Sequence, residues 1–171
     1  QKPDKEFTLV LDDWQKNGND FNMGMMDMGM NHNTMNYNLF TINGLSAPDA
    51  KPLDVKQGDK VRIRLINASS STTHPMHLHG HQFTVVAEDG NELPPAQQRT
   101  RNTITLNPGE TYDVEVTANN PGVWAFHCHE LHHAGSGMLT LFKYEGYNVL
   151  SGSQQDTNTN TEDSMMNHSM H

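Results

Sequence analysis

Cysteine is almost absent from this sequence, since Cys128 is the only one among 171 residues. A disulfide within the chain is therefore impossible, and cysteine usage does not indicate the redox compartment. Long apolar runs are missing as well. A membrane-spanning helix needs about 18 or more consecutive apolar residues, and no such stretch occurs. The sequence thus excludes a disulfide scaffold and predicts no membrane span.

Positive charge is also scarce. Lysine and arginine number 11 against 20 acidic residues, for a net charge of −9. This balance argues against nucleic acid or an anionic membrane as a partner. Hydrophobic residues make up only 34% of the chain. The length and this composition predict one small domain with long polar loops and tails.

Short segments with alternating apolar and polar residues recur along the chain, as in half-buried β-strands. Turn signals such as Asn43-Gly44 and Asp89-Gly90 separate them. The pattern indicates an all-β Greek-key sandwich or barrel. Strands are predicted at residues 6–11, 37–42, 60–67, 82–88, 103–106, 111–117, 123–128 and 138–144, with a single helical turn at 130–133.

The flanks differ from this core in composition. Residues 17–36 are rich in Met, Asn and Gly, and the end of the chain is too polar to order itself. We therefore expect an N-terminal strand and linker with a flexible Met-rich segment at 1–36, a domain at 37–148, and a disordered tail at 149–171. Because the chain opens at Gln1 without a start Met or signal peptide, we expect a piece of a longer protein or a cut end.

Two clusters of metal-ligand residues stand out. The first, at residues 74–81, reads HPMHLHGH; the second begins with the HCH of residues 127–129 and ends at Met138. Two imidazoles, one thiolate and a distant thioether are the ligands of a blue-copper electron-transfer centre. Zinc is the alternative metal, although a structural zinc site favours paired cysteines and has no use for Met. An isolated Cys or His is usually structural, but these residues are concentrated in two short clusters.

The spacing within the clusters predicts how the ligands divide. Cys128, His133 and Met138 are evenly spaced, so a strand end and the loop after it can bring them to one metal, with His74 arriving from another strand. Alternate side chains of a strand point to opposite faces. His127 and His129 should therefore point away from the side that Cys128 faces. The geometry predicts two metal centres joined by one short stretch of backbone.

The motifs of residues 74–80 and 127–133, followed by Met138, resemble the C-terminal cupredoxin domain of multicopper oxidases, which include laccases and the cuprous oxidases of copper resistance. The resemblance covers roughly residues 37–144 and implies a cupredoxin-like fold. It also implies catalytic roles for Cys128, His127 and His129, which would carry electrons onward. The implied ligands are His74, Cys128, His133 and axial Met138 for type 1 copper, His77 for type 2 copper, and His79, His127 and His129 for the type 3 pair.

In this family a reductant, phenolic or Cu(I), is oxidised at type 1 copper, and dioxygen is reduced to water at a trinuclear cluster with eight histidine ligands. This chain offers four of them, at positions 77, 79, 127 and 129. The resemblance therefore implies half a cluster, completed by an N-terminal cupredoxin domain or a second chain, in an extracytoplasmic setting. We expect the isolated chain to be blue and to reduce no dioxygen. The alternative is a stand-alone electron-transfer or copper-binding cupredoxin without oxidase activity.

Thioether sulfur favours Cu(I), so the Met-rich segment is either a collection site for cuprous ion or a plain linker. Its methionines are Met23, Met25, Met26, Met28, Met30 and Met35, and the tail adds Met165, Met166, His168, Met170 and His171 as weaker candidates. Other residues have weaker claims. His81 and His132 adjoin the candidate ligands and are expected to support them or to face solvent. Glu130 and Asp113 are expected to assist proton supply or to face water. Trp124 and Phe126 are expected to be core residues that dry the copper site, and Asn67 to hydrogen bond near the thiolate or to cap a turn.

Overall fold

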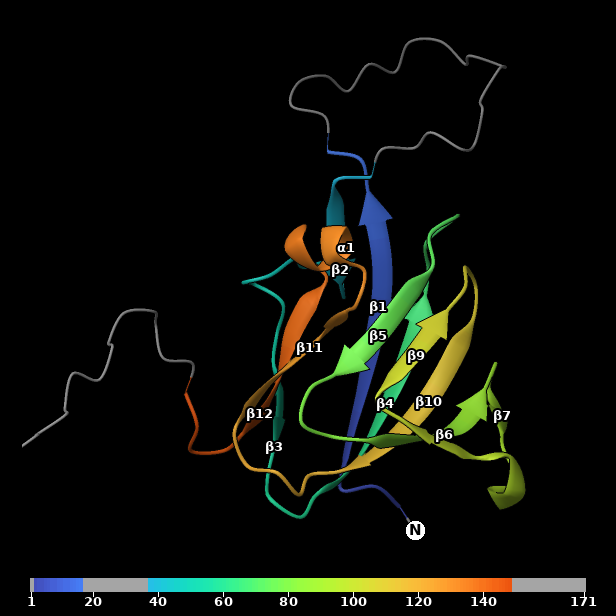
Figure 1. The fold of residues 1–171 in the computed structure, drawn as a ribbon, viewed down its shortest axis with the longest axis vertical. Helices are drawn as coiled ribbons and strands as arrows, with labels where there is room; N and C mark the ends of the chain where they lie inside the picture. Colours follow the sequence, from blue (N-terminus) through green and yellow to red (C-terminus); the bar gives the residue numbers. More distant parts are fainter. Residues whose placement is uncertain (1, 17–36, 149–171) are drawn as a thin grey trace, which may run out of the picture.

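Two β-sheets packed face to face form the protein (Figure 1), in a computed structural model that describes residues 2–16 and 37–148. The seven-stranded sheet has the order β2-β1-β4-β10-β6-β7, with β8 also paired to β6, and the five-stranded sheet has the order β3-β12-β11-β5-β9. The strands of the first sheet are β1 (Lys5–Trp14), β2 (Leu39–Ile42), β4 (Lys60–Asn67), β6 (Phe83–Glu88), β7 (Asn91–Glu92), β8 (Arg99–Arg101) and β10 (Thr111–Thr117). Those of the second are β3 (Leu53–Val55), β5 (His74–Leu78), β9 (Thr103–Leu106), β11 (Val123–Cys128) and β12 (Leu139–Tyr144).

Alternation in the sequence accounts for the longer strands. In β4, Val61, Ile63 and Leu65 are fully buried, whereas Lys60 and Arg64 are exposed. The all-β prediction is confirmed, and the strands predicted at 60–67, 103–106, 111–117 and 123–128 have the expected bounds. The other predicted strands shift by one to three residues. The predicted helical turn is the short helix α1 (Leu131–Gly135), and no described helix is long and apolar enough to cross a membrane.

Strand β1 lies inside the larger sheet, between β2 and β4. It pairs in parallel with β4, with Phe7 opposite Ile63 and Leu9 opposite Leu65. Leu9 and Leu11 are buried between the sheets. The first strand is therefore packed in the same sandwich as residues 37–148, from which the predicted division had separated it. The Met-rich segment connects β1 to β2 and lies outside the described residues, as does the C-terminal tail.

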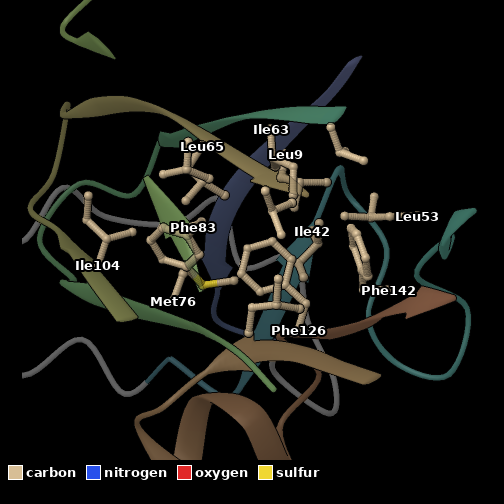
Figure 2. Packing of buried hydrophobic residues seen from close by; sticks show 14 of the residues in the cluster. Leu9, Ile42, Leu53, Ile63, Leu65, Met76, Phe83, Ile104, Phe126 and Phe142 are labelled. Atoms are coloured by element: carbon tan, nitrogen blue, oxygen red, sulfur yellow. The ribbon is translucent and has the colours of Figure 1, made fainter. Parts of the chain in front are cut away.

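Large apolar side chains from both sheets fill the space between them (Figure 2). Phe83 and Leu65 meet Met76 and Phe126 there, all at most 1% exposed. Burial of this kind, at about 25 cal/mol per Å² of apolar surface, is the main stabilising term of such a domain. Phe126 is thus a core residue as predicted, while Trp124 is half-buried against the cluster.

Asp113 has a structural environment. It is 2% exposed on β10 and accepts hydrogen bonds from Arg62 and Arg64 of β4. Burial alone would raise the pKa of this carboxyl, but the two arginines outweigh burial and hold the pKa below its usual value. Neither predicted role, proton supply or facing water, fits this paired carboxylate, which bridges two adjacent strands.

Candidate metal centre

Strands β5 and β11 bring the two clusters side by side. They pair antiparallel, with His77 opposite His127 and Met76 opposite Cys128. Cys128 and Met76 are fully buried between the sheets, whereas His127 is half-buried and His129 exposed on the other side. The strand therefore has the alternation that the sequence predicts, with the sulfur and the neighbouring imidazoles on opposite faces.

On the inner face, two imidazoles converge on the thiol. Nδ1 of His133 lies 3.5 Å from Sγ of Cys128, and Nδ1 of His74 lies 3.9 Å from it. The three ligand atoms lie within 4.8 Å of one another. Metal–sulfur and metal–nitrogen bonds of about 2.3 and 2.0 Å, at angles of about 110–120°, would separate sulfur and nitrogen by about 3.5–3.8 Å. One soft sulfur and two imidazoles at this separation fit a trigonal copper site.

Met138 is held near this group by the backbone. The N–H of Cys128 donates to the carbonyl of Met138 over 3.0 Å, and the N–H of Met138 donates to the carbonyl of His133 over 3.0 Å. Met138 is fully buried. The loop from Cys128 to Met138 is thereby closed on itself by hydrogen bonds. The chain brings together all four residues predicted as the type 1 ligands, at the end of the sandwich where α1 lies (Figure 1).

On the outer face, four imidazoles gather. The ring centroids of His77 and His79 are 4.9 Å apart, and those of His79 and His127 are 5.0 Å apart. His129 lies 5.2 Å from His77 and 5.8 Å from His127. Nε2 of His79 is only 2.9 Å from Nε2 of His127. The residues predicted for the type 2 and type 3 coppers therefore lie together, facing away from Cys128.

Hydrogen bonds orient two of these rings. A carbonyl oxygen only accepts, so Nδ1–H of His77 donates to the carbonyl of Asn102 over 2.9 Å, and Nδ1–H of His127 donates to the carbonyl of Cys128 over 2.7 Å. Nε2 of each ring then carries a lone pair, and at His127 this lone pair faces Nε2 of His79, 2.9 Å away. Such bonds to the non-ligating nitrogen hold metal-binding histidines in place. The rings open onto a cleft of about 660 Å³ that His77 and His79 help to line.

Comparison with known proteins connects this geometry to one family. The sequence model of the family described as multicopper oxidase matches residues 10–147. The chain belongs to the multicopper oxidase family. Membership implies copper as the metal. Membership in this family agrees with the resemblance that the sequence motifs predicted. The match begins within strand β1, whereas the predicted resemblance covered only residues 37–144.

Relatives of this multicopper oxidase chain include proteins of several activities. Copper resistance protein A of Pseudomonas syringae pv. tomato is 39% identical over 106 residues, which cover 62% of this chain and 16% of that protein. L-ascorbate oxidase of Cucurbita pepo var. melopepo is 39% identical over 100 residues, which cover 51% of this chain and 18% of that protein. The chain thus spans less than a fifth of the length of these relatives.

Solved structures agree on the fold. Multicopper oxidase mgLAC superimposes with a TM-score of 0.69 at 31% identity, covering 90% of this chain and 46% of that one. Blue copper oxidase from Nitrosomonas europaea gives a TM-score of 0.65 at 32% identity, covering 82% and 43%. The predicted cupredoxin-like class is therefore confirmed.

Burial sets the protonation of His74, His133 and Cys128 in the copper-free chain. Burial, with the nearby His133 ring adding to it, lowers the pKa of His74 to about 4. The pKa of His133 is also lowered by burial. Burial raises the pKa of the Cys128 thiol to about 11. At neutral pH both imidazoles therefore offer free lone pairs, and a metal must displace the thiol proton as it binds.

Phe40, which the sequence did not point to, and Glu130 support His133. The ring of Phe40 on β2 stacks against it, with centroids 4.2 Å apart and planes 22° apart. The carboxylate of Glu130 accepts from the His133 backbone N–H over 2.9 Å and lies 3.4 Å from its Nε2. Glu130 thus caps α1 and holds the ligand ring. Asp13 of β1 lies opposite Phe40 of β2 and is buried. Its carboxylate accepts a hydrogen bond from the Thr72 hydroxyl.

The remaining predicted residues have defined places. His81 is buried and His132 is exposed. The side-chain amide of Asn67 donates to the carbonyls of Thr72 and Leu106, and its oxygen accepts from Ser69. Asn67 therefore joins the segment before His74 to β9. Of the two roles predicted for Asn67, this arrangement corresponds to capping a turn. The methionines at 23–35 and 165–170 and the histidines at 168 and 171 lie outside the described residues.

Gly137, just before Met138, has no room for a side chain. Its φ is +120°, and a Cβ there would lie 2.4 Å from Cβ of Ser46 and 2.7 Å from the carbonyl oxygen of Phe40. We expect Gly137→Ala to lower the free energy of unfolding by about 3 kcal/mol or more through strain and overlap. Urea unfolding of the copper-free chain measures this effect.

Gly135 provides the matched control two residues earlier. A Cβ there would meet nothing within 4 Å, and the residue ends α1. Gly135→Ala should leave stability unchanged or raise it by up to about 1 kcal/mol, because Gly is the weaker helix former. Equal losses in both variants would contradict the close approach of β2 to the ligand loop.

Proposed function

We propose that this chain is the C-terminal, type 1 copper-bearing domain of a laccase-like multicopper oxidase, of the cuprous-oxidase kind. The observation that carries the proposal is the placement of Cys128 and its two neighbours on opposite faces of β11. His74, Cys128, His133 and Met138 would hold type 1 copper, and His77, His79, His127 and His129 half of the trinuclear cluster. Copper at these positions would supply one-electron oxidation of a reductant and reduction of dioxygen to water.

The chain's own residues prepare both sites. Burial of Cys128 and His74 keeps water from the inner ligands, and the stacked Phe40 ring limits movement of His133. His77 and His127 present Nε2 lone pairs on the outer face because their Nδ1 protons are bound to carbonyls. The two ligand sets share the backbone of residues 127–129, the shortest covalent connection that a strand allows.

A partner must supply the other half of the cluster under this proposal. The described outer face contributes four imidazoles and a cleft of about 660 Å³ beside them. An N-terminal cupredoxin domain, on the same polypeptide or a second chain, would seat its histidines against this face. The chain matches only 16–18% of the length of the relatives named above, which supports a domain of a larger enzyme. An extracytoplasmic location is proposed with it.

The experiment combines metal analysis with oxygen uptake. The purified chain, loaded with copper, should hold one thiolate-bound copper and show the blue absorption, yet consume no dioxygen with a phenolic or Cu(I) reductant. Addition of the complementary domain should start oxygen consumption. Sustained reduction of dioxygen to water by the chain alone would refute the half-cluster assignment. A blue chain that no complementary domain activates would favour the stand-alone electron-transfer protein.

Cuprous ion is the proposed reductant because the Met-rich segment leaves and re-enters the fold beside the inner site. The N–H of Asn38 donates to the carbonyl of Trp14, so the described residues on either side of the segment meet close to Phe40, which contacts His133. One relative is named a copper resistance protein. Replacing the six methionines at 23–35 with leucine should slow bleaching of the blue colour by Cu(I) but not by an organic reductant. Equal slowing with both would contradict the collection role.

A further inference from the structure

The backbone around His79 is held by an unusually complete set of hydrogen bonds. The His79 N–H donates to the carbonyl of Ala125 over 3.0 Å. Its carbonyl accepts from the ring of His81 at 3.1 Å, and the other nitrogen of that ring lies 2.7 Å from the hydroxyl of Tyr144. His81 is 7% exposed and Tyr144 is 1% exposed. A buried chain of contacts thus runs from the end of β12 to an outer-face histidine.

For a neutral His81 ring, only one arrangement of protons satisfies this chain. The Tyr144 hydroxyl accepts from the backbone N–H of Asn120 over 3.0 Å, so its own proton is free to donate to Nε2 of His81. The His79 carbonyl can only accept, so Nδ1 of His81 carries the other proton. Burial favours the neutral ring, which these contacts hold in the Nδ1–H form. The tyrosine hydroxyl selects this form, and the form in turn donates to His79.

Asn120 and Trp124 hold the next residue of the turn. The side-chain amide of Asn120 donates to the carbonyl of Gly80 over 3.0 Å, and the indole N–H of Trp124 donates to the carbonyl of Asn120 over 2.7 Å. Gly80 has a φ of +67°, and a Cβ there would lie 2.6 Å from the indole ring. The turn after His79 is thus packed against Trp124 with no space for another residue type.

We propose that Tyr144 and His81 are positioning residues for His79, which they hold with its ring directed toward His127. Neither side chain touches the proposed copper atoms, and His81 acts only through the His79 carbonyl. Copper binding by His79 rests on the proposed function. The restraint itself is a property of the metal-free chain, because every contact in it joins atoms of this chain.

Tyr144→Phe tests the proposal, with Tyr112→Phe as the matched control. Tyr112 also donates its hydroxyl proton, to Glu88 over 3.1 Å, but it lies on β10 of the other sheet. Imidazole ¹⁵N NMR of the metal-free chain should show His81 as a single Nδ1–H form in the wild type. In Tyr144→Phe, His81 should lose this single form and exchange its ring proton up to about tenfold faster, since a hydrogen bond contributes up to about 1.4 kcal/mol. The His79 ring signals should broaden or average as well.

His81→Gln is the second variant, and thermal unfolding establishes that each protein is folded. It should disturb the His79 signals as Tyr144→Phe does, while Tyr112→Phe should not. Sharp, unshifted His79 signals in both Tyr144→Phe and His81→Gln would overturn the proposal. Cu(II) uptake gives a separate readout: Tyr144→Phe should weaken binding at the outer histidines about tenfold without changing the blue absorption. If His79→Ala leaves Cu(II) uptake unchanged, the proposed half-cluster fails, and the NMR comparison still decides the positioning role.

Discussion

Cys128→Ser is expected to abolish the blue absorption of the copper-loaded chain completely. The colour of such a centre comes from the bond between copper and a thiolate, and a serine hydroxyl cannot replace soft sulfur. His74 and His133 would remain, so any copper retained at the inner site should have the weak absorption and wide EPR splitting of nitrogen and oxygen ligands. Absorption and EPR spectra of the two proteins measure the change.

The fold should tolerate this substitution. A serine hydroxyl at position 128 would lie near two imidazole nitrogens, at the places that now face sulfur, so it has hydrogen-bond partners although it is buried. We expect the free energy of unfolding of the copper-free chain to change by less than about 2 kcal/mol. Cu(II) uptake at the outer histidines should be unchanged, since their side chains lie on the opposite face of β11.

His132→Gln is the matched control for Cys128→Ser. His132 adjoins the ligand His133 but is exposed, and its ring contacts the edge of Phe40. The variant should keep the blue absorption at full intensity. Retention of colour in Cys128→Ser would show that sulfur is not a ligand, and loss of colour in His132→Gln would show that the ligand set is wrong.

Strands with a clear period of two were predictable because burial on one side imposes that period on the residues themselves. The strand at 60–67 is the clearest case. Strands β3, β7 and β8 were not predicted, since two or three residues are too few to show alternation. The parallel pairing of β1 with β4 was not predictable either. It joins segments far apart in sequence, and no local pattern records which strands become neighbours.

That the candidate ligand residues lie together was predictable for a different reason. Metal coordination restricts the residue types to His, Cys and Met, and the strand geometry converts their spacing into faces. The residues that hold the ligands are not restricted in this way. Nothing in the sequence distinguishes Phe40, Asp13 and Tyr144 from other strand residues. Only the packing of the sheets brings Phe40 to His133, Asp13 to Thr72 and Tyr144 to His81. Glu130 was named from the sequence, but for proton supply or exposure to water, and its role as the cap of α1 was not predicted.

Acid should destabilise the copper-free chain strongly between pH 6.5 and about 4. In the unfolded chain His74 has a pKa of 6.5, and in the folded chain burial lowers this pKa to about 4. Between these values the unfolded state binds one more proton, so the free energy of unfolding falls as the pH falls. The shift corresponds to about 3 kcal/mol at 1.36 kcal/mol per pH unit. Below pH 4 this residue should cause no further loss.

The cause is the place of the ring in the fold. His74 is fully buried, and its Nε2 has no hydrogen-bond partner, so a second proton on the ring would put a charge in apolar surroundings with no acceptor for the Nε2–H. Burial also lowers the pKa values of His133 and His127, which adds to the loss in the same direction. Cys128 affects stability at high pH instead. Its pKa is raised from 9.0 to about 11, so stability should fall again as the pH rises through that interval.

Urea unfolding of the copper-free chain at a series of pH values measures the profile. His74→Gln, which does not ionise, should flatten the acid limb, whereas His132→Gln should reproduce the wild-type slope. An identical slope in wild type and His74→Gln would assign the acid sensitivity to other groups. Copper should steepen the limb, because bound imidazoles must lose the metal before they accept protons. A pH profile that copper leaves unchanged would show that His74 and the metal do not compete, and therefore that His74 is not a ligand.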